Sequence, residues 1–243
     1  MPTHFARSRR SFLKKFAALS ALAGGSLPAA VLDQQQKALL KKSVKAIAHN
    51  DRLQIATIGM GIIGFIDTVT ALSVPGIELV ATCDLYDGRL EHTKEVFGSH
   101  VVTTRNYLKI LERDDVDAVL ICTPDHWHTL ISVTALRSGK DVQCEKPTLT
   151  IDEGKTLIRE VRKWGKVLQT STEDRAVPVY HRMAELVRNG RVGKLEKIEV
   201  ILPKQPTVPG NPTPQPVPPD LDYDMWLGPA PEAPYTKDRV HFH

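Results

Sequence analysis

The chain has 243 residues, of which 42% are hydrophobic and 25% charged, and its formal net charge is +4. This composition is typical of a globular protein with room for one full domain and part of another. No basic stripe with interleaved aromatic residues is present, so nucleic acid is not an expected partner. The three cysteines, Cys83, Cys122 and Cys144, end predicted buried strands, which favours packed thiols over a disulfide framework.

Residues 1–30 have the pattern of a twin-arginine export signal. Arg9 and Arg10 end a basic stretch, and an apolar run over 16–32 follows, interrupted by glycine and proline. The run is shorter and less apolar than the roughly 20 residues that span a membrane, so no stable span is expected in the mature form. A disordered basic N-terminus is the alternative. The signal predicts a location in the periplasm or outside the cell, for a protein that is exported folded, often around a cofactor.

A polar connector over 31–50 leads to a glycine-rich turn between a strand and a helix. The apolar run LQIATIG is followed by Gly59, Gly61 and Gly64 in a G-x-G-x-x-G pattern, and then by the helical pattern FIDTVTALSV. The first glycine permits a tight turn, the second lets the backbone approach a pyrophosphate, and the third lets helix and strand pack closely. The pattern alone is weak, since a glycine turn can occur without any nucleotide.

Asp84 strengthens the interpretation as a dinucleotide site. It ends the next predicted strand, IELVATCD, 20 residues after Gly64, where a carboxylate would bind the adenosine ribose hydroxyls. A carboxylate at this position favours NAD over NADP, because it would repel a 2′-phosphate. Arg89 lies near enough in the sequence to leave NADP possible.

Strands and amphipathic helices then alternate as far as residue 171. This order predicts an α/β fold, with a doubly wound parallel Rossmann sheet over 51–171. Thr150 and Glu153 form the pattern of a capping box before one of the helices. Ligands of such sheets bind beyond the carboxyl ends of the strands, where the stretches CTPDHWHT (122–129) and CEKPTLT (144–150) lie.

These motifs, in this order, resemble the glucose-fructose oxidoreductase and inositol dehydrogenase (Gfo/Idh/MocA) family. The resemblance runs from residue 53 to about 230, and YDMWLGPAP (223–231) is similar to its exported, sugar-acting branch. It implies that Lys146 is the catalytic acid or base, that Glu145 lines the cofactor site, and that the Lys146–Pro147 peptide is cis. A lysine beside a nicotinium ring and a sugar hydroxyl can accept the hydroxyl proton as hydride leaves. The predicted cofactor-binding residues are Gly59, Gly61, Ile62, Ile63, Gly64, Asp84, Arg89, Thr123, Pro124, Asp125, His126, Trp127, His128, Glu145 and Lys146.

Simpler roles remain open for several of these residues. Lys146 could be a solvated charge at a strand end, Trp127 a packing residue, and His128 a helix cap. For His126 and His128, such a role is favoured over direct catalysis. The pair could also chelate zinc, but no third or fourth ligand has a suitable spacing, so no metal is predicted.

Residues 172–243 are predicted to begin an α+β substrate domain built on a mostly antiparallel sheet, and to leave it incomplete. A helix over 179–190, an amphipathic strand over 195–202 and a proline-rich loop over 203–219 are expected, the loop with eight prolines in seventeen positions. The resemblance implies substrate contacts from Tyr180 and Arg175. The family's second domain continues further, so this chain is expected to be a fragment or a truncated form, and to form a homo-oligomer only at full length.

Three functions are compatible with the sequence. The first is an exported NAD(P)-dependent oxidoreductase that acts on a hydroxyl or keto group of a sugar or polyol, with a tightly bound cofactor. The second is a glycoside hydrolase of the same fold that uses NAD transiently; Lys146 argues against it, because the resemblance implies that this branch lacks the lysine. The third is a non-catalytic nucleotide-binding remnant.

Overall fold

The computed structural model describes residues 48, 51–146, 148–202 and 213–240, and these form two units. The first, here called the nucleotide-binding unit after its predicted role, contains residues 51–172 together with 218–232, and the second unit contains the described residues of 173–217 and 233–240. The predicted export signal, the connector apart from Ala48, and Pro147 lie outside the described residues, so the export signal and the cis peptide stay predictions.

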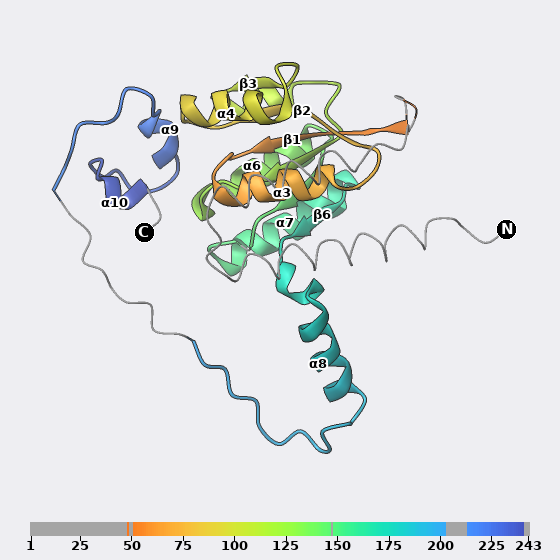
Figure 1. The fold of residues 1–243 in the computed structure, drawn as a ribbon. Coiled ribbons are helices and arrows are strands. Elements are labelled where there is room, and N and C mark those ends of the chain that lie inside the picture. Colours follow the sequence, from red (N-terminus) through yellow and green to blue (C-terminus); the bar gives the residue numbers. More distant parts are fainter. Residues whose placement is uncertain (1–47, 49–50, 147, 203–212, 241–243) are drawn as a thin grey trace. The chain divides into compact units, whose positions relative to one another are not determined.

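A parallel sheet of six strands, in the order β3-β2-β1-β4-β5-β6, forms the centre of the nucleotide-binding unit (Figure 1). The predicted doubly wound α/β fold is therefore confirmed. The strands are β1 (Leu53–Ile58), β2 (Ile77–Cys83), β3 (Val102–Thr104), β4 (Ala118–Ile121), β5 (Asp141–Cys144) and β6 (Leu168–Thr170). The helices between them are α3 (Ile62–Leu72), α4 (Asp87–Phe97), α5 (Tyr107–Leu111), α6 (Asp125–Arg137) and α7 (Ile151–Trp164), and a short helix, α9 (Tyr223–Leu227), follows much later in the chain.

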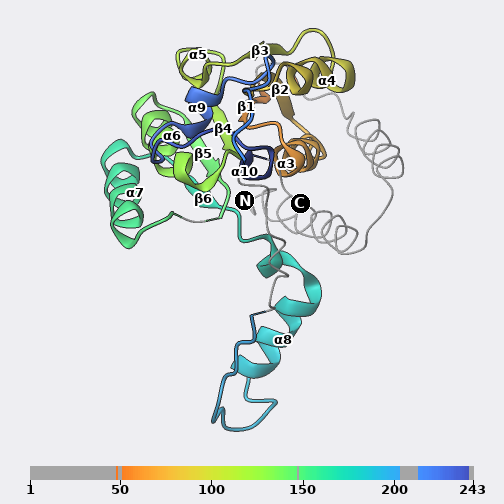
Figure 2. The same ribbon diagram turned by 90° about the vertical axis from the view of Figure 1, so that its left-hand side faces the viewer.

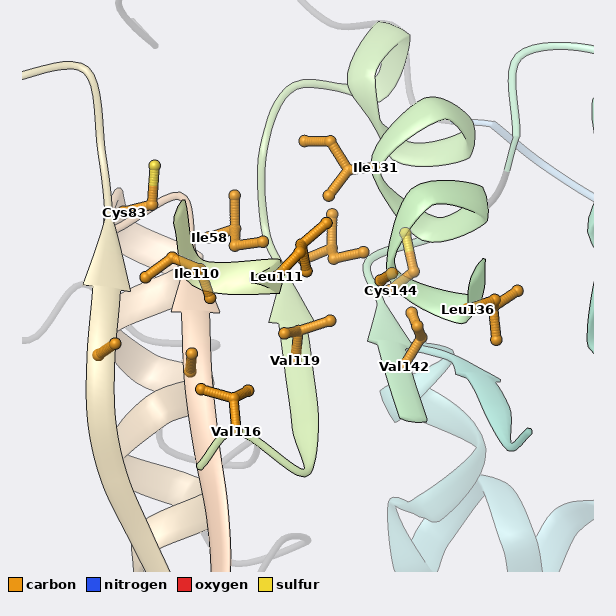
Figure 3. Packing of buried hydrophobic residues seen from close by; sticks show 14 of the residues in the cluster. Ile58, Cys83, Ile110, Leu111, Val116, Val119, Ile131, Leu136, Val142 and Cys144 are labelled. Atoms are coloured by element: carbon orange, nitrogen blue, oxygen red, sulfur yellow. The ribbon is translucent and has the colours of Figure 1, made fainter. Parts of the chain in front are cut away.

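Alternate residues of each strand pack on opposite faces of the sheet. On one face, Ile58 and Val119 contact Ile131 of α6 and its neighbours in the larger core cluster, which Figure 3 shows from close by. On the other face, Ile55 and Leu120 pack with residues of α3 and α4. Both faces are covered, which explains why the strands are nearly continuous apolar runs.

Local sequence signals fix the ends of the helices. The predicted capping box is present: the Thr150 side chain accepts a hydrogen bond from the Glu153 backbone, and the Glu153 carboxylate accepts one from the Thr150 backbone. Across the interface between α6 and α7, Arg137 donates two hydrogen bonds to Glu160, at 2.8 and 3.1 Å. The Arg137 guanidinium lowers the pKa of the Glu160 carboxyl to about 2, with a further contribution from Trp164.

In the described part of the second unit, the regular secondary-structure elements are helices. A 3-10 turn (Glu173–Ala176) precedes α8 (Pro178–Arg188), and α10 (Lys237–Val240) lies near the end of the chain. The predicted strand over 195–202 is wrong, since none of these residues is in a strand, and Ile198 and Val200 are more than 70% exposed. An alternating strand needs neighbouring strands to pair its backbone and bury its apolar side, and none is present in the described part of this unit.

The proline-rich stretch is described only in part. Residues 203–212 lie outside the described residues, and 213–217 have no regular secondary structure. None of the helices in the described ranges combines the length and the apolar character that crossing a membrane requires.

Candidate active site

The site lies where the strand order reverses. The chain proceeds from β1 outward to β2 and β3, then returns to the other side of β1 with β4. The crevice beyond the carboxyl ends of β1 and β4 is the position at which doubly wound sheets bind dinucleotides. The predicted cofactor residues all follow the carboxyl ends of four strands, namely β1, β2, β4 and β5.

The glycine loop fits closely against the end of β4. Gly59 has a φ of +94°, and a Cβ atom there would lie 2.6 Å from the carbonyl oxygen of Cys122. A Cβ on Gly64 would lie 1.8 Å from the carbonyl oxygen of Gly59. Neither position has room for a side chain, whereas a Cβ on Gly61 would meet only the end of the Arg89 side chain, at 3.7 Å. Of the three glycines of the loop, only Gly61 therefore has open space around its backbone.

The N-terminus of α3 faces this opening. Gly61 is its N-cap and supplies no capping side chain, and the first turn has no acidic residue. Ile62 and Ile63 follow in the first turn with exposed side chains, and the backbone N–H groups of a first helical turn have no partner within the helix. Such unpaired N–H groups, with the helix dipole, favour a phosphate anion.

Asp84 is held rigidly at the end of β2. Its Oδ2 accepts a hydrogen bond from the Met60 backbone at 2.7 Å, and its Oδ1 accepts one from the Tyr86 backbone at 3.0 Å. Arg89 Nη1 lies 3.3 Å from Oδ2, and the guanidinium carbon lies 4.8 Å from the centre of the Tyr86 ring. The adenosine end of the crevice therefore carries a buried carboxylate and a half-exposed cation together. The sequence analysis did not identify Tyr86, although an aromatic residue beside a strand-end acid and an arginine is a usable signal.

On the other side of the crevice, a buried histidine supports the turn from β4 into α6. His128 is almost completely buried, and its Nε2 lies 2.7 Å from the carbonyl oxygen of Thr123. A carbonyl only accepts, so Nε2 carries the proton and His128 supports the turn. The Thr123 hydroxyl is buried and has no hydrogen-bond partner among the described residues. Pro124, the N-cap of α6, is exposed.

His126 and Trp127 contact another part of the same unit. His126 Nε2 and Trp127 Nε1 lie 2.9 and 3.2 Å from the carbonyl oxygen of Trp226, in α9. Their ring nitrogens therefore have protein partners. The sequence analysis did not predict α9, although Asp222 before it and Gly228 after it are ordinary helix start and stop signals.

Lys146 lies just beyond β5. Its Nζ is 3.5 Å from Asp125 Oδ1, and both side chains are more than half exposed. The contact is a weak ion pair that leaves the amine accessible. Glu145 is buried, and its Oε2 accepts a hydrogen bond from the Lys146 backbone at 3.3 Å. The structure thus brings Asp125, Glu145 and Lys146 together at one edge.

Tyr180 and Arg175 lie in the second unit, on α8 and in the 3-10 turn. Tyr180 is half exposed, and the substrate contacts predicted for these two residues stay predictions.

The cysteines are free thiols, as expected. Burial, more than any nearby charge, raises the pKa of each thiol, that of Cys144 to about 11. Cys122 Sγ also lies 3.7 Å from Asp67 Oδ2, which further raises the pKa of this thiol. The thiols are therefore packing residues. Within the described residues, no group of three or more His, Cys, Asp or Glu side chains is arranged to hold a metal ion.

Two family models match the chain. The NAD-binding Rossmann fold of the GFO_IDH_MocA oxidoreductase family matches residues 53–172, and its C-terminal alpha/beta domain matches residues 209–243. The chain belongs to the Gfo/Idh/MocA oxidoreductase family. The glycine loop, the buried Asp84 and the unpartnered Thr123 hydroxyl fit the dinucleotide that this Rossmann domain binds.

Individual family members agree with this assignment over part of the chain. Myo-inositol 2-dehydrogenase of Thermotoga maritima is 29% identical over 172 residues, which is 70% of this chain and 48% of the relative. A glycosyl hydrolase family 109 protein of Shewanella sp. is 33% identical over 159 residues, 60% of this chain and 35% of the relative. The crystal structure of scyllo-inositol dehydrogenase from Lactobacillus casei, with bound NAD(H) and scyllo-inositol, is 25% identical and gives a TM-score of 0.55 over 58% of this chain and 42% of that one.

The chain spans about half the length of the curated relatives it matches.

The glycine loop offers a direct test. In the variant Gly64→Ala, the new Cβ meets the Gly59 carbonyl oxygen, and we expect the free energy of unfolding to fall by about 1–3 kcal/mol and NAD binding to be lost. Gly88→Ala is the matched control, because a Cβ there meets nothing within 4 Å in α4. Chemical denaturation and titration calorimetry measure the two effects, and equal behaviour of the two variants would contradict the assignment.

Proposed function

We propose that this protein is an NAD(P)-dependent oxidoreductase that transfers hydride between the nicotinamide and a hydroxyl or keto carbon of a sugar or polyol. The observation that carries the proposal is the position of Lys146. Its exposed amine lies at the carboxyl end of β5, on the same edge of the sheet as the glycine loop and Asp84. A bound nicotinamide would supply the hydride acceptor, and the relatives named as inositol dehydrogenases support a polyol as substrate.

Residues of this chain would transfer the proton of the substrate hydroxyl. Lys146 Nζ would accept the proton of the substrate hydroxyl and return it in the reverse direction. Asp125 would orient Lys146 by accepting from its Nζ. The Glu145 carboxylate would do so by accepting from the Lys146 backbone N–H. The polar turn from Thr123 to Asp125 would border the nicotinamide.

Replacement of Lys146 tests this role. Lys146→Ala is expected to abolish turnover, by a factor of at least about 100, while the dissociation constant for NAD⁺ changes little. Lys155→Ala, which removes an exposed lysine of α7 paired with Asp152, should leave both quantities unchanged. The assay follows nicotinamide absorbance with a panel of inositols and sugars. Full turnover in Lys146→Ala would refute the role.

Two other functions are tested in the same assay. The 33% identity to a glycosyl hydrolase family 109 protein favours a hydrolase that oxidises its substrate only transiently. Cleavage of aryl glycosides without net reduction of NAD⁺ would support this second function. Binding of NAD⁺ without turnover of any substrate would indicate a nucleotide-binding protein that is not a catalyst.

Arg89 governs the choice between NAD and NADP in this proposal. Its guanidinium lies against Asp84 and the Tyr86 ring, where the 2′ position of the adenosine ribose would lie. Asp84 favours NAD, and Arg89 would compensate for the charge of a 2′-phosphate.

We therefore expect Arg89→Ala to weaken NADP⁺ binding by about tenfold or more, and NAD⁺ binding much less. Arg113→Ala is a control on the charge, because Arg113 pairs with Asp115 before the amino end of β4, away from the carboxyl ends of the strands. Titration calorimetry with both nucleotides measures the difference. An equal loss for NAD⁺ and NADP⁺ in Arg89→Ala would contradict selection by this residue.

We further propose that the protein is exported folded with its cofactor tightly bound, and that it forms a homo-oligomer. The Arg9-Arg10 motif supports export. Because no pool of free nicotinamide nucleotide exists outside the cytoplasm, the cofactor would be loaded before export and recycled on the enzyme. Protein isolated from the periplasm should then release about one nucleotide per chain on denaturation. Empty sites, or a need for added NAD⁺ at each turnover, would contradict the proposal.

A further inference from the structure

Residues 218–232, here called the brace segment, belong to the nucleotide-binding unit although 45 residues, from 173 to 217, separate them from the first part of this unit in the chain. Figure 2 shows α9, which lies in this segment, beside α5 and α6. The residues fall within the match to the family's C-terminal domain model, yet they pack on the Rossmann sheet. The brace segment contacts this unit at two places.

The first place is the end of β2. Leu221 forms an isolated antiparallel bridge with Tyr86, and the Asp222 backbone donates to the Leu85 carbonyl at 3.2 Å. The Asp220 carbonyl accepts hydrogen bonds from the Asp87 backbone and from Arg105. The brace segment is thus fixed beside the residues that follow Asp84, on the adenosine side of the crevice.

The second place is the first turn of α6. A single carbonyl, that of Trp226, accepts from both His126 and Trp127. The Trp226 ring also lies edge-on to the His126 ring, with 5.6 Å between centroids, and stacks on Tyr223 at 5.9 Å. The two donors follow Asp125 directly in the sequence, so this contact fixes the orientation of the turn that carries Asp125.

Gly228 shows how closely the two parts fit. Its φ is +47°, and a Cβ at this position would lie 2.0 Å from the Trp127 ring. No other residue could occupy this position without moving either Trp127 or the brace segment. The indole therefore packs against bare backbone, as the glycine loop does on the opposite side of the site.

We propose that the brace segment positions the nicotinamide half of the cofactor site. It holds His126 and Trp127, keeps the turn from Thr123 to Asp125 beside the nicotinamide, and directs Asp125 towards Lys146. The role rests on the proposed dinucleotide binding and adds a selective consequence: loosening α9, which contacts the first turn of α6, weakens binding of the nicotinamide more than binding of the ADP-ribose part. The latter is held by the glycine loop, α3 and Asp84, none of which is held by Trp226.

The N-cap of α9 provides the first test. Asp222 Oδ1 accepts a hydrogen bond from the Met225 backbone, so Asp222→Ala loosens α9 without changing any residue of the crevice. Asp222→Asn is the matched control, because asparagine caps helices about as well as aspartate. In the full chain, we expect Asp222→Ala to weaken NAD⁺ binding by about fivefold and to leave ADP-ribose binding within about twofold, whereas Asp222→Asn binds both like the wild type.

A second pair of variants tests the contact with Trp127. Gly228→Ala places a methyl group against the indole and should show the same selective loss of NAD⁺ affinity. Gly139→Ala, at the other end of α6, also has a positive φ but meets nothing within 4 Å, so it controls for backbone strain. Trp127→Phe removes one donor to Trp226 and keeps an aromatic ring; it gives the same readout if the other variants do not fold.

Titration calorimetry with NAD⁺ and with ADP-ribose separates the outcomes. A rise in the dissociation constant for NAD⁺ relative to that for ADP-ribose, in Asp222→Ala, Gly228→Ala or Trp127→Phe, supports positioning by the brace segment. An unchanged ratio, or an equal loss of both ligands, overturns it and leaves α9 a purely structural helix. If the wild-type chain binds neither ligand, the proposed function itself fails.

Discussion

The close approach of the glycine loop to the end of β4 is the constraint on which the site depends. Because Gly59 lies against the Cys122 carbonyl and Gly64 against the Gly59 carbonyl, β1, α3 and β4 meet within van der Waals contact. Met60, between these glycines, is thereby placed to donate its backbone N–H to Asp84. One packing requirement therefore sets the opening for the phosphates and the orientation of the carboxylate.

Charge is distributed along the carboxyl edge of the sheet in a simple order. Asp84 pairs with Arg89 at one end, and Asp125 pairs with Lys146 at the other. Between them lies the Cys122 thiol, whose pKa is raised by burial and by the nearby Asp67 carboxylate, so it stays neutral at ordinary pH.

Local patterns in the sequence predicted the Rossmann sheet well, because a buried parallel strand and an amphipathic helix each carry their own periodicity. The predicted strand over 195–202 was wrong, since its alternation describes a surface that needs neighbours absent from the described residues. The G-x-G-x-x-G pattern and Asp84 identified a loop and a strand-end carboxylate that the structure brings into contact, through the Met60 backbone. The partners of His126 and Trp127 were not predictable in this way, because they come from α9, about 100 residues later, and no short-range pattern reports such a contact.

The position of the brace segment in the chain affects how the nucleotide-binding unit assembles. Residues 173–217 separate the two parts of the unit, so the ends of this stretch must come together before Trp226 can meet Trp127, and closing 45 residues costs about 3 kcal/mol of chain entropy. The aromatic contacts and hydrogen bonds of α9 must offset that cost. During synthesis, the Rossmann sheet can form once β6 has emerged, but its surface over α6 is completed only after residue 232. The unit is thus continuous in space but made of two separate segments of the chain.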